Sequence, residues 1–366
     1  LFFSKAAAEI LAHRPELFGN PDIVHCNDWH TGALATMLKN QKSKIKDQKR
    51  ENPKVIFTIH NLANQGAWAA DTVNGWFFAA DEVQSFKPMG ADINPMAEGI
   101  RSADAVTTVS PTYAKEILTP AYGEGLEGVL RTRRDDLVGI LNGISYRAFN
   151  PATDPKIATP FSADTPERKA LNKLSLQHAL GLTVGAGIPL FGLIARLTEQ
   201  KGIDLVGAAA EQFLARYPGQ FVFLGRGTPA LEATLSVLAG RFPGRVATHI
   251  GFDERLARRI YASSDFFLMP SRFEPSGLGQ MIAMRYGTIP IARATGGLID
   301  SIEDGKTGFL FEQPTVAALG KALQAALQCY QNEPQFRQMR SNCFRENFDF
   351  KNAARSYLEL YQQLAK

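Results

Sequence analysis

The sequence of 366 residues contains only three cysteines, and it lacks both a long apolar run and a marked excess of charge of one sign. Cys26, Cys329 and Cys343 have no paired short spacing, which excludes a zinc-type grouping and predicts buried thiols of a reducing compartment. No apolar run is long enough to span a membrane and no signal-peptide pattern occurs, so we expect a cytoplasmic protein.

The net charge of +4 results from 40 Lys and Arg against 36 Asp and Glu. An excess this small in a chain of this length gives no reason to expect a nucleic-acid partner. The basic cluster at 39–50 is interpreted as a solvated surface segment between two elements. The composition leaves the oligomeric state open.

The amino-acid composition is typical of a globular protein with a large core. Hydrophobic residues make up 45% of the chain and charged residues 21%. The length predicts two domains, and both halves alternate short apolar runs with helical patterns, which is typical of α/β domains with parallel sheets. Between the halves, residues 149–160 are rich in Pro, Thr and Asp, the composition of a linker.

The most informative stretch is 265–300, which predicts a strand–helix–strand unit. Its expected elements are a buried strand at 266–269, a helix at 277–286 and a second buried strand at 289–292. In such a unit the loops 271–276 and 293–297 lie at the carboxyl ends of neighbouring strands, where open α/β sheets bind ligands.

Two features of these loops allow alternative interpretations. Thr295, Gly296 and Gly297 at a helix start offer backbone N–H groups to a phosphate or diphosphate. Glu274 follows Arg272 closely. The alternative to a ligand site is that Glu274 pairs with Arg272 and that the glycines only form a turn.

Charged and polar residues also follow other predicted strands. Arg196 and Lys201 come after the strand 190–194 and before a helix at 203–217, and two cations beside a helix start form a strong anion site. Asp28 and His60 follow the strands 22–25 and 55–59, so we expect both at one sheet edge. His25 and His30 do not converge well enough for a metal site.

The aromatic segment 67–99, which includes Trp68, Trp76, Phe77, Phe78 and Phe86, allows two interpretations. Its side chains could stack on sugar rings or form a local core, and we favour the core.

Seven segments in chain order carry a resemblance to a known family. They are His25-Cys-Asn-Asp-Trp-His, Thr58-Ile-His-Asn-Leu-Ala, Val109-Ser-Pro-Thr-Tyr, Leu141-Asn-Gly-Ile, Ala195-Arg-Leu-Thr-Glu-Gln-Lys-Gly, Pro270-Ser-Arg-Phe-Glu-Pro-Ser-Gly-Leu and Ala294-Thr-Gly-Gly-Leu. Together they closely resemble bacterial glycogen synthases and plant starch synthases, the ADP-glucose-dependent retaining α-1,4-glucan synthases.

The resemblance implies the α/β fold called GT-B, in which two Rossmann-like, doubly wound domains face each other across a cleft. We expect an acceptor-side domain at 1–145, a nucleotide-sugar-binding domain at 146–345 and a final helix at 346–366 that crosses back to the first domain. The implied function is transfer of glucose from ADP-glucose, as donor substrate, to the non-reducing end of an α-1,4-glucan, without a cofactor.

The resemblance also implies roles for particular residues. By similarity, Arg196 and Lys201 bind the donor diphosphate and stabilise the leaving nucleotide, and Glu274 contacts glucosyl hydroxyls. His60 and Asp28 line the sugar end of the cleft. The implied substrate-binding residues are Asn142 near the donor, Thr295, Gly296 and Gly297 at the diphosphate, and Gly277 and Leu298 in the same two motifs.

The chemistry of the residues agrees with this function. Two fixed cations and a helix start supply positive charge where a departing nucleoside diphosphate develops negative charge. No Asp-x-Asp pair, which would bind a divalent metal for the same purpose, occurs in the sequence. We therefore predict metal-independent transfer.

The sequence also departs from the family pattern. The family's first strand and its Lys-x-Gly-Gly-Leu loop have no counterpart here, so we expect that this part of the first domain is missing from the chain. Asn64, Ser145, Ser276 and Ile282 replace residues that are usual in the family. Two alternatives stay open: a related GT-B transferase with another nucleotide sugar or acceptor, and a truncated homologue that binds glucan without catalysis.

Overall fold

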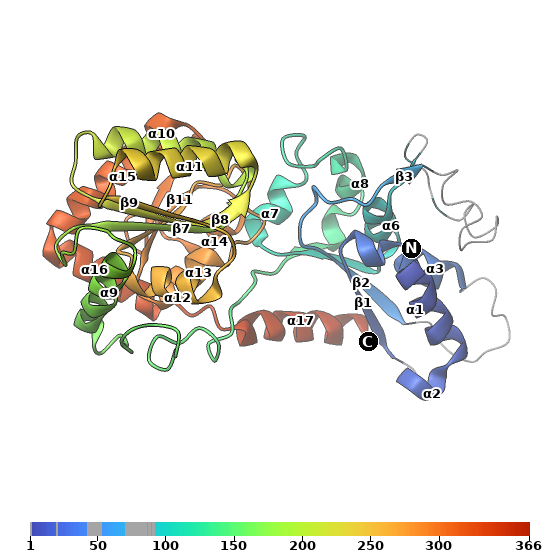
Figure 1. Ribbon diagram of the computed structural model, residues 1–366. Coiled ribbons are helices and arrows are strands. Elements are labelled where there is room, and N and C mark those ends of the chain that lie inside the picture. The colour runs from blue at the N-terminus through green and yellow to red at the C-terminus, as the bar shows by residue number, and fades with distance from the viewer. Residues whose placement is uncertain (1, 20, 42–52, 70–85, 87–88, 90–91) are drawn as a thin grey trace. The chain divides into compact units, whose positions relative to one another are not determined.

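The computed structural model describes residues 2–19, 21–41, 53–69, 86, 89 and 92–366, and contacts divide the chain into two compact units (Figure 1). Unit 1 comprises Leu1–Leu141 and Ala353–Lys366, and unit 2 comprises Asn142–Asn352. Most of the basic cluster at 39–50, and the aromatic residues Trp76, Phe77 and Phe78, lie outside the described residues.

The described part of unit 1 is built on a four-stranded parallel sheet in the order β1-β2-β5-β6. The strands are β1 (Ile23–Asn27), β2 (Lys54–Ile59), β5 (Ala105–Thr108) and β6 (Leu137–Gly139), and a short antiparallel pair is formed by β3 (Trp68–Ala69) and β4 (Asp92–Ile93). The helices are α1 (Phe2–His13), α2 (Pro15–Phe18), α3 (Trp29–Gln41), α6 (Pro95–Ser102), α7 (Pro111–Glu116), α8 (Glu127–Arg131) and the 3-10 turn η1 (Arg134–Asp136).

The core of unit 1 follows from its apolar strands. Phe57 and Ile59 of β2 are fully buried and pack in one cluster with Met96 and Ile100 of α6. The helix α6 begins as its sequence predicts, because the Asn94 side chain accepts a hydrogen bond from the Ala97 N–H and Pro95 occupies the first turn.

Unit 2 is built on a six-stranded parallel sheet in the order β12-β11-β10-β7-β8-β9. Its strands are β7 (Leu190–Leu197), β8 (Gln220–Gly227), β9 (Val246–Ile250), β10 (Phe266–Met269), β11 (Ile289–Arg293) and β12 (Phe309–Phe311). Its helices are η2 (Pro166–Arg168), α9 (Lys169–Ala179), η3 (Glu199–Lys201), α10 (Ile203–Leu214), α11 (Pro229–Arg241), α12 (Glu254–Ser263), α13 (Gly279–Arg285), α14 (Gly296–Ser301), α15 (Val316–Gln331) and α16 (Glu333–Arg345).

The sheet of unit 2 is doubly wound, which confirms the predicted fold class for this unit. The helices α10, α11 and α15 cover one face, and α9, α12 and α13 cover the other (Figure 1). The strand order runs outward in both directions from the neighbouring strands β7 and β10. The point between these two strands is therefore the topological switch point, where doubly wound sheets bind their ligands.

Phenylalanines stack across the central strands of this sheet. Phe191 of β7 is paired in register with Phe221 of β8 and with Phe266 of β10. The ring centroids of Phe191 and Phe221 are 4.9 Å apart, and those of Phe191 and Phe266 are 5.2 Å apart. Such stacked aromatic pairs stabilise neighbouring strands beyond their buried area.

The segment 149–160, whose composition indicated a linker, packs into unit 2. Buried Asp154 accepts a hydrogen bond of 2.5 Å from the Tyr286 hydroxyl and lies 3.5 Å from the Arg258 guanidinium. The same guanidinium stacks 3.8 Å from the centroid of the Phe149 ring. The linker interpretation is therefore wrong for this segment, because specific partners in the folded unit hold its polar residues.

The last helix, α17 (Phe350–Leu364), belongs to unit 1 from Ala353 onward. Tyr361 of this helix is hydrogen-bonded through its hydroxyl to Nδ1 of His25 at 2.7 Å, and the Tyr357 ring lies 5.3 Å from the His25 ring. Residues at opposite ends of the chain thus meet in one unit.

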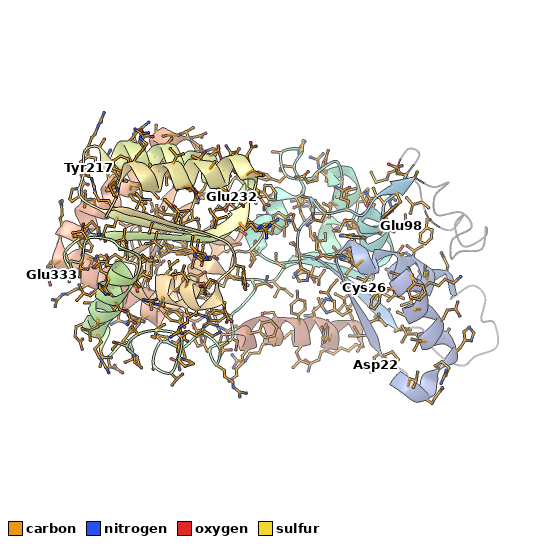
Figure 2. All side chains as sticks on the ribbon, viewed as in Figure 1. Asp22, Cys26, Glu98, Tyr217, Glu232 and Glu333 are labelled. Atoms are coloured by element: carbon orange, nitrogen blue, oxygen red, sulfur yellow. The ribbon has the colours of Figure 1, made fainter. Side chains whose placement is uncertain are left out.

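The three cysteines are buried free thiols, as predicted. Cys26 lies in β1 (Figure 2), and burial raises its pKa to about 12. Burial also raises the pKa of Cys329 to about 11. Among the described helices, none is long and apolar enough to cross a membrane.

Candidate active site

The candidate site of unit 2 lies at the switch point between β7 and β10. Arg196 is the penultimate residue of β7, and Lys201 ends the turn η3 that follows. Glu274 lies in the loop after β10, and Gly296 begins α14 after β11. Because all these strands are parallel, the sheet brings their carboxyl ends, and hence these four residues, to one edge.

Lys201 and Glu274 form an ion pair at the centre of this edge. The Lys201 Nζ donates to Glu274 Oε2 at 2.5 Å, and the Ser271 hydroxyl donates to the same oxygen at 2.9 Å. The side chains of Lys201 and Glu274 are 18% and 8% exposed, so the pair is largely shielded from water. Shielding strengthens the attraction and makes either charge costly to leave alone.

The alternative that Glu274 pairs with Arg272 is wrong. Arg272 instead forms a two-pronged contact with Asp204 of α10, with both N–O distances at 2.7 Å, and it donates to the Glu199 carbonyl at 2.6 Å. The hydrogen bond from Arg272 lowers the pKa of Asp204, and Asp204 in turn raises the pKa of Arg272. This contact fastens the loop after β10 to the start of α10 and so brings Lys201 to Glu274.

Arg196 is the more accessible cation of the site. Its side chain is exposed, and its guanidinium donates to Gln200 Oε1 at 3.2 Å. The Gln200 carbonyl in turn accepts from the Arg272 N–H at 2.8 Å. An anion at this edge would therefore meet the exposed guanidinium of Arg196 as well as the ammonium of Lys201.

The Thr295-Gly296-Gly297 turn requires its glycines. Gly296 has φ +47°, and a Cβ there would collide with the Glu274 carbonyl; a Cβ at Gly297 would collide with the Ser276 carbonyl. The Gly297 N–H donates to the Glu274 carbonyl at 3.1 Å. This N–H, which the sequence led us to expect facing an anion, is thus engaged by the neighbouring loop.

The other implied substrate-binding residues of unit 2 have different surroundings. Leu298 is fully buried, so its side chain belongs to the core, and Gly277 adopts φ +69° in the loop before α13. Asn142 is half-buried beside Gly143, whose missing Cβ lets the backbone of Phe350 approach closely.

In unit 1, Asp28 and His60 meet at the carboxyl ends of β1 and β2. Asp28 has φ 57°, which few residues other than glycine adopt, and its Oδ1 accepts from the His60 backbone N–H at 2.8 Å. The His60 ring Nε2 lies 2.9 Å from Asn27 Oδ1. The sheet edge therefore fixes the histidine ring and the aspartate side by side, as their places in the sequence predicted.

His25 is a structural residue. Its Nδ1 contacts Tyr361, and its Nε2 lies 2.6 Å from Thr58 Oγ1, which in turn lies 2.6 Å from Thr107 Oγ1. Both ring nitrogens are thus occupied. Within the described parts of the chain, no group of three or more His, Cys, Asp or Glu side chains could hold a metal ion.

The aromatic segment 67–99 divides between both interpretations. Among its described members, Phe86 is buried, in keeping with a local core, whereas Trp68 is 52% exposed.

Two residues of unit 2 with unusual surroundings were not identified from the sequence. Phe252, just after β9 at the carboxyl edge, is 94% exposed, although a large aromatic side chain is costly to leave in water. Gln280 is fully buried in α13 among apolar neighbours. The sequence signal for Gln280 was a glutamine directly before the apolar residues 281–284 of the helix.

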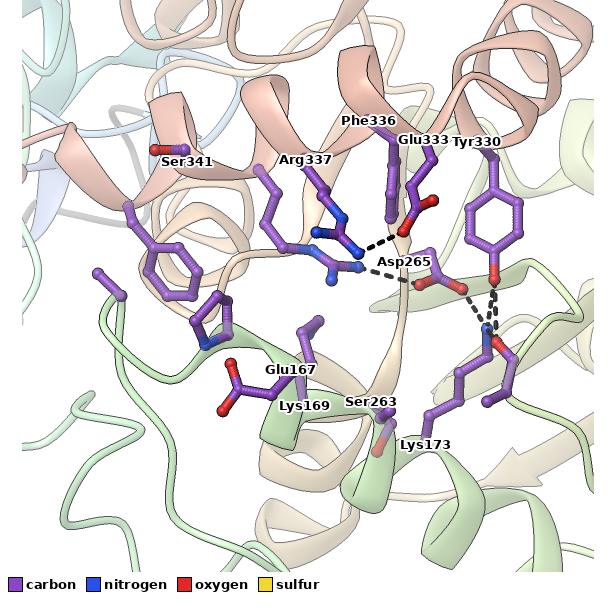
Figure 3. Close-up of a pocket in the computed structure, with 16 residues that line it drawn as sticks. Glu167, Lys169, Lys173, Ser263, Asp265, Tyr330, Glu333, Phe336, Arg337 and Ser341 are labelled. Carbon is purple, nitrogen blue, oxygen red and sulfur yellow. Dashed lines mark hydrogen bonds and ion pairs between the residues drawn. The ribbon is translucent and has the colours of Figure 1, made fainter.

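A cavity of about 590 Å³ opens at the opposite, amino edge of unit 2 (Figure 3). Asp265, which precedes β10, pairs there with Lys173 at 2.7 Å and with Arg340 at 3.2 Å, and Glu333 pairs with Arg337. The buried carboxylate of this cavity is therefore neutralised within the protein. At the carboxyl edge, in contrast, Arg196 has no carboxylate partner among the described residues.

Two α/β units with parallel sheets, one of them doubly wound with two cations at its switch point, together with the similarity to solved structures reported below, define the class of the protein as a GT-B glycosyltransferase. Residues 1–132 match the family model described as starch synthase catalytic domain, and residues 186–343 match glycosyl transferases group 1. Glycogen synthase 2 of Nitrosococcus oceani is 43% identical over 99% of this chain and 74% of its own length. Glycogen synthase of Thermodesulfovibrio yellowstonii is 40% identical over 100% of this chain and 72% of its own length. The chain belongs to the glycogen synthase and starch synthase family.

Solved structures agree with this assignment. The catalytic domain of Starch Synthase IV from Arabidopsis thaliana, bound to ADP and acarbose, is similar with a TM-score of 0.90 and 35% identity, covering 100% of this chain and 76% of that one. Sucrose-phosphate synthase from Thermosynechococcus elongatus, at 21% identity and a TM-score of 0.63 over 99% of this chain and 77% of that one, shares the fold.

Proposed function

We propose that this protein transfers glucose from ADP-glucose to the non-reducing end of an α-1,4-glucan, with retention of configuration at the anomeric carbon. The observation that carries the proposal is the pair of cations Arg196 and Lys201 at the switch point of unit 2. The relatives named glycogen synthase support it, as does the similar starch synthase domain bound to ADP and acarbose.

The proposed chemistry rests on stabilising the leaving group. When the bond between the glucosyl carbon and the diphosphate breaks, negative charge grows on the departing ADP. Arg196 and Lys201 stand at the sheet edge where this charge would form, and positive charge held there lowers the barrier to departure of the nucleotide. In this proposal Thr295, Gly296 and Gly297 border the same diphosphate.

Glu274 has two functions in this proposal. Its carboxylate accepts hydrogen bonds from glucosyl hydroxyls, and it holds the Lys201 ammonium in place by their contact of 2.5 Å. In this proposal Asp28 and His60 of unit 1 contact the sugar, and Asn142 of unit 2 contributes near the donor. Unit 2 would accordingly bind the donor and unit 1 the acceptor.

We further propose that the protein acts in the cytoplasm on a nucleotide sugar and a glucan and that it binds no nucleic acid. The slight net charge of +4 supports the last point, because nucleic-acid binding depends on concentrated positive charge.

The test is incorporation of labelled glucose into a glycogen primer from ADP-glucose and, separately, from UDP-glucose. We expect incorporation from ADP-glucose that Lys201→Ala abolishes, whereas Lys306→Ala, which removes an exposed lysine of unit 2, leaves it unchanged. Incorporation from UDP-glucose alone would instead assign a related GT-B transferase. Glucan binding without ADP binding or transfer would make the chain a non-catalytic homologue and overturn the proposal.

A further inference from the structure

Gln280 is a polar residue in a place where packing calls for an apolar one. It is the second residue of α13, its exposed fraction is 0%, and Met281, Ile282 and Ala283 beside it are buried core residues. A buried amide is costly unless hydrogen bonds compensate the loss of water, so its contacts explain its presence.

The side-chain amide of Gln280 donates both to the loop after β10 and to the last residue of helix α14. Its Nε2 lies 3.0 Å from the Ser276 carbonyl, 3.0 Å from the Gly277 carbonyl and 3.0 Å from the Ser301 hydroxyl. Two of these partners are carbonyl oxygens, which only accept, and they require the NH₂ end of the amide to face them. The orientation of the amide is therefore determined by the network.

Ser301 extends this hydrogen-bond network to the glycine turn. Its hydroxyl, which accepts from Gln280, donates to the Gly297 carbonyl at 2.5 Å. The Gly297 N–H donates back to the Glu274 carbonyl at 3.1 Å. A circuit of hydrogen bonds thus runs from Gln280 through Ser301 and Gly297 to Glu274, and the backbone from 274 to 280 closes it. The circuit joins the loop after β10 to the turn after β11.

The circuit is poorly explained by stability alone. The Oε1 atom of Gln280 and the Oγ atom of Ser276 are both buried and have no hydrogen-bond partner among the described residues. Leaving a buried acceptor unsatisfied costs free energy, and methionine would fill the same volume without this cost. An amide occupies this position although its oxygen is unsatisfied, which indicates that its donor end has a function.

We propose that Gln280 is a positioning residue for the glucosyl transfer reaction. It holds the sugar-side loop with Glu274 and the diphosphate-side turn with Gly297 in a single arrangement, so that the donor meets both at once. The proposal rests on the proposed function of the site. Its physical basis is that small displacements of groups that bind a reacting substrate reduce the rate strongly.

The experiment compares Gln280→Met with a matched control, Gln177→Met. Gln177 is also a fully buried glutamine of unit 2, and its Nε2 donates to the Gly185 carbonyl and to Gln220, away from both loops. Amide hydrogen exchange at Gly297, ADP affinity by calorimetry, glucan affinity, and the kcat and KM for ADP-glucose are measured for both full-length variants.

We expect Gln280→Met to accelerate exchange at Gly297, to weaken ADP binding about tenfold, and to lower kcat by a larger factor than glucan affinity, since the hydrogen bonds of the Gln280 amide are lost. Gln177→Met should leave exchange at Gly297 and ADP affinity unchanged. Ser301→Ala, which interrupts the circuit but keeps Gln280, should give the same changes to a smaller degree, and the double variant should be no worse than Gln280→Met alone.

Equal effects of Gln280→Met and Gln177→Met would overturn the proposal, because they would indicate a general loss of stability. Unchanged ADP affinity and unchanged exchange at Gly297 in a folded Gln280→Met variant would also overturn it. Absence of glucosyl transfer in the unmodified protein would refute the proposed function and not the circuit, which the exchange measurement tests without turnover.

Discussion

Replacing Lys201 by methionine separates its structural effect from its binding effect. The substitution keeps most of the volume of the side chain but removes the ammonium that contacts Glu274 Oε2 at 2.5 Å. The Glu274 carboxylate, 8% exposed, then keeps only the Ser271 hydroxyl at 2.9 Å as a partner among the contacts described above. An uncompensated charge is left in a largely buried place.

The expected cost is large for a single substitution. Breaking a buried ion pair by removing one partner typically costs about 3–5 kcal/mol, and the 18% exposure of Lys201 leads us to expect about 3 kcal/mol. The double variant Lys201→Met with Glu274→Gln should recover most of this loss, because no buried charge remains. Lys306→Met, which breaks an exposed pair with Glu303, should cost less than about 1 kcal/mol.

ADP binding should respond differently from stability. Loss of one charge-assisted contact to the diphosphate weakens binding by about 1.5–3 kcal/mol, which corresponds to roughly 10- to 150-fold in Kd. Because this loss comes from the missing ammonium, the double variant should bind ADP no better than Lys201→Met alone. Stability is thus expected to be restored while affinity is not.

The assay is urea denaturation followed by far-ultraviolet circular dichroism, together with calorimetry of ADP binding. Tryptophan fluorescence serves as an internal control, since the described tryptophans Trp29 and Trp68 belong to unit 1. A Lys201→Met variant as stable as the unmodified protein, or a double variant no more stable than the single one, would refute the reasoning about the buried pair. Unchanged ADP affinity would refute the assignment of Lys201 to the diphosphate.

Three further predictions concern the surroundings of the site. Because Arg272 lowers the pKa of Asp204, their ion pair should stabilise unit 2 fully at pH values above the ordinary aspartate pKa. This stabilisation should be lost as the pH falls through the lowered pKa. Asp204→Asn should therefore remove this part of the pH dependence of urea denaturation. Burial, and to a smaller extent the charge of His60, lowers the pKa of His25. Unit 1 should therefore lose stability as the pH falls below about 6.5, the ordinary pKa of histidine. Unfolding of His25→Gln, monitored by tryptophan fluorescence, should not show this loss. Gly296→Ala should abolish glucosyl transfer and destabilise unit 2 more than Gly305→Ala, which has a similar positive φ but open space around its Cβ position; equal costs would contradict the steric argument.

Much of the architecture was readable from local patterns. The unit at 265–300 was predicted as strand, helix and strand, and β10, α13 and β11 occupy these places. It was readable because apolar runs long enough for buried strands end at polar loops. The helix α11 was not identified, since Leu235 and Leu238 are buried while Val237 is exposed, which blurs the apolar periodicity.

The order of residues along the chain is enough to show which side chains follow the strands, and hence which of them a parallel sheet would bring to its carboxyl edge. Arg196, Lys201, Glu274 and the glycine turn were identifiable for this reason. The partners of these residues, in contrast, depend on how the chain folds in three dimensions. Glu274 pairs with Lys201, 73 positions away, and not with its near neighbour Arg272, because the strand order places β7 beside β10. Pairings across a sheet depend on such crossovers, which local sequence patterns do not encode.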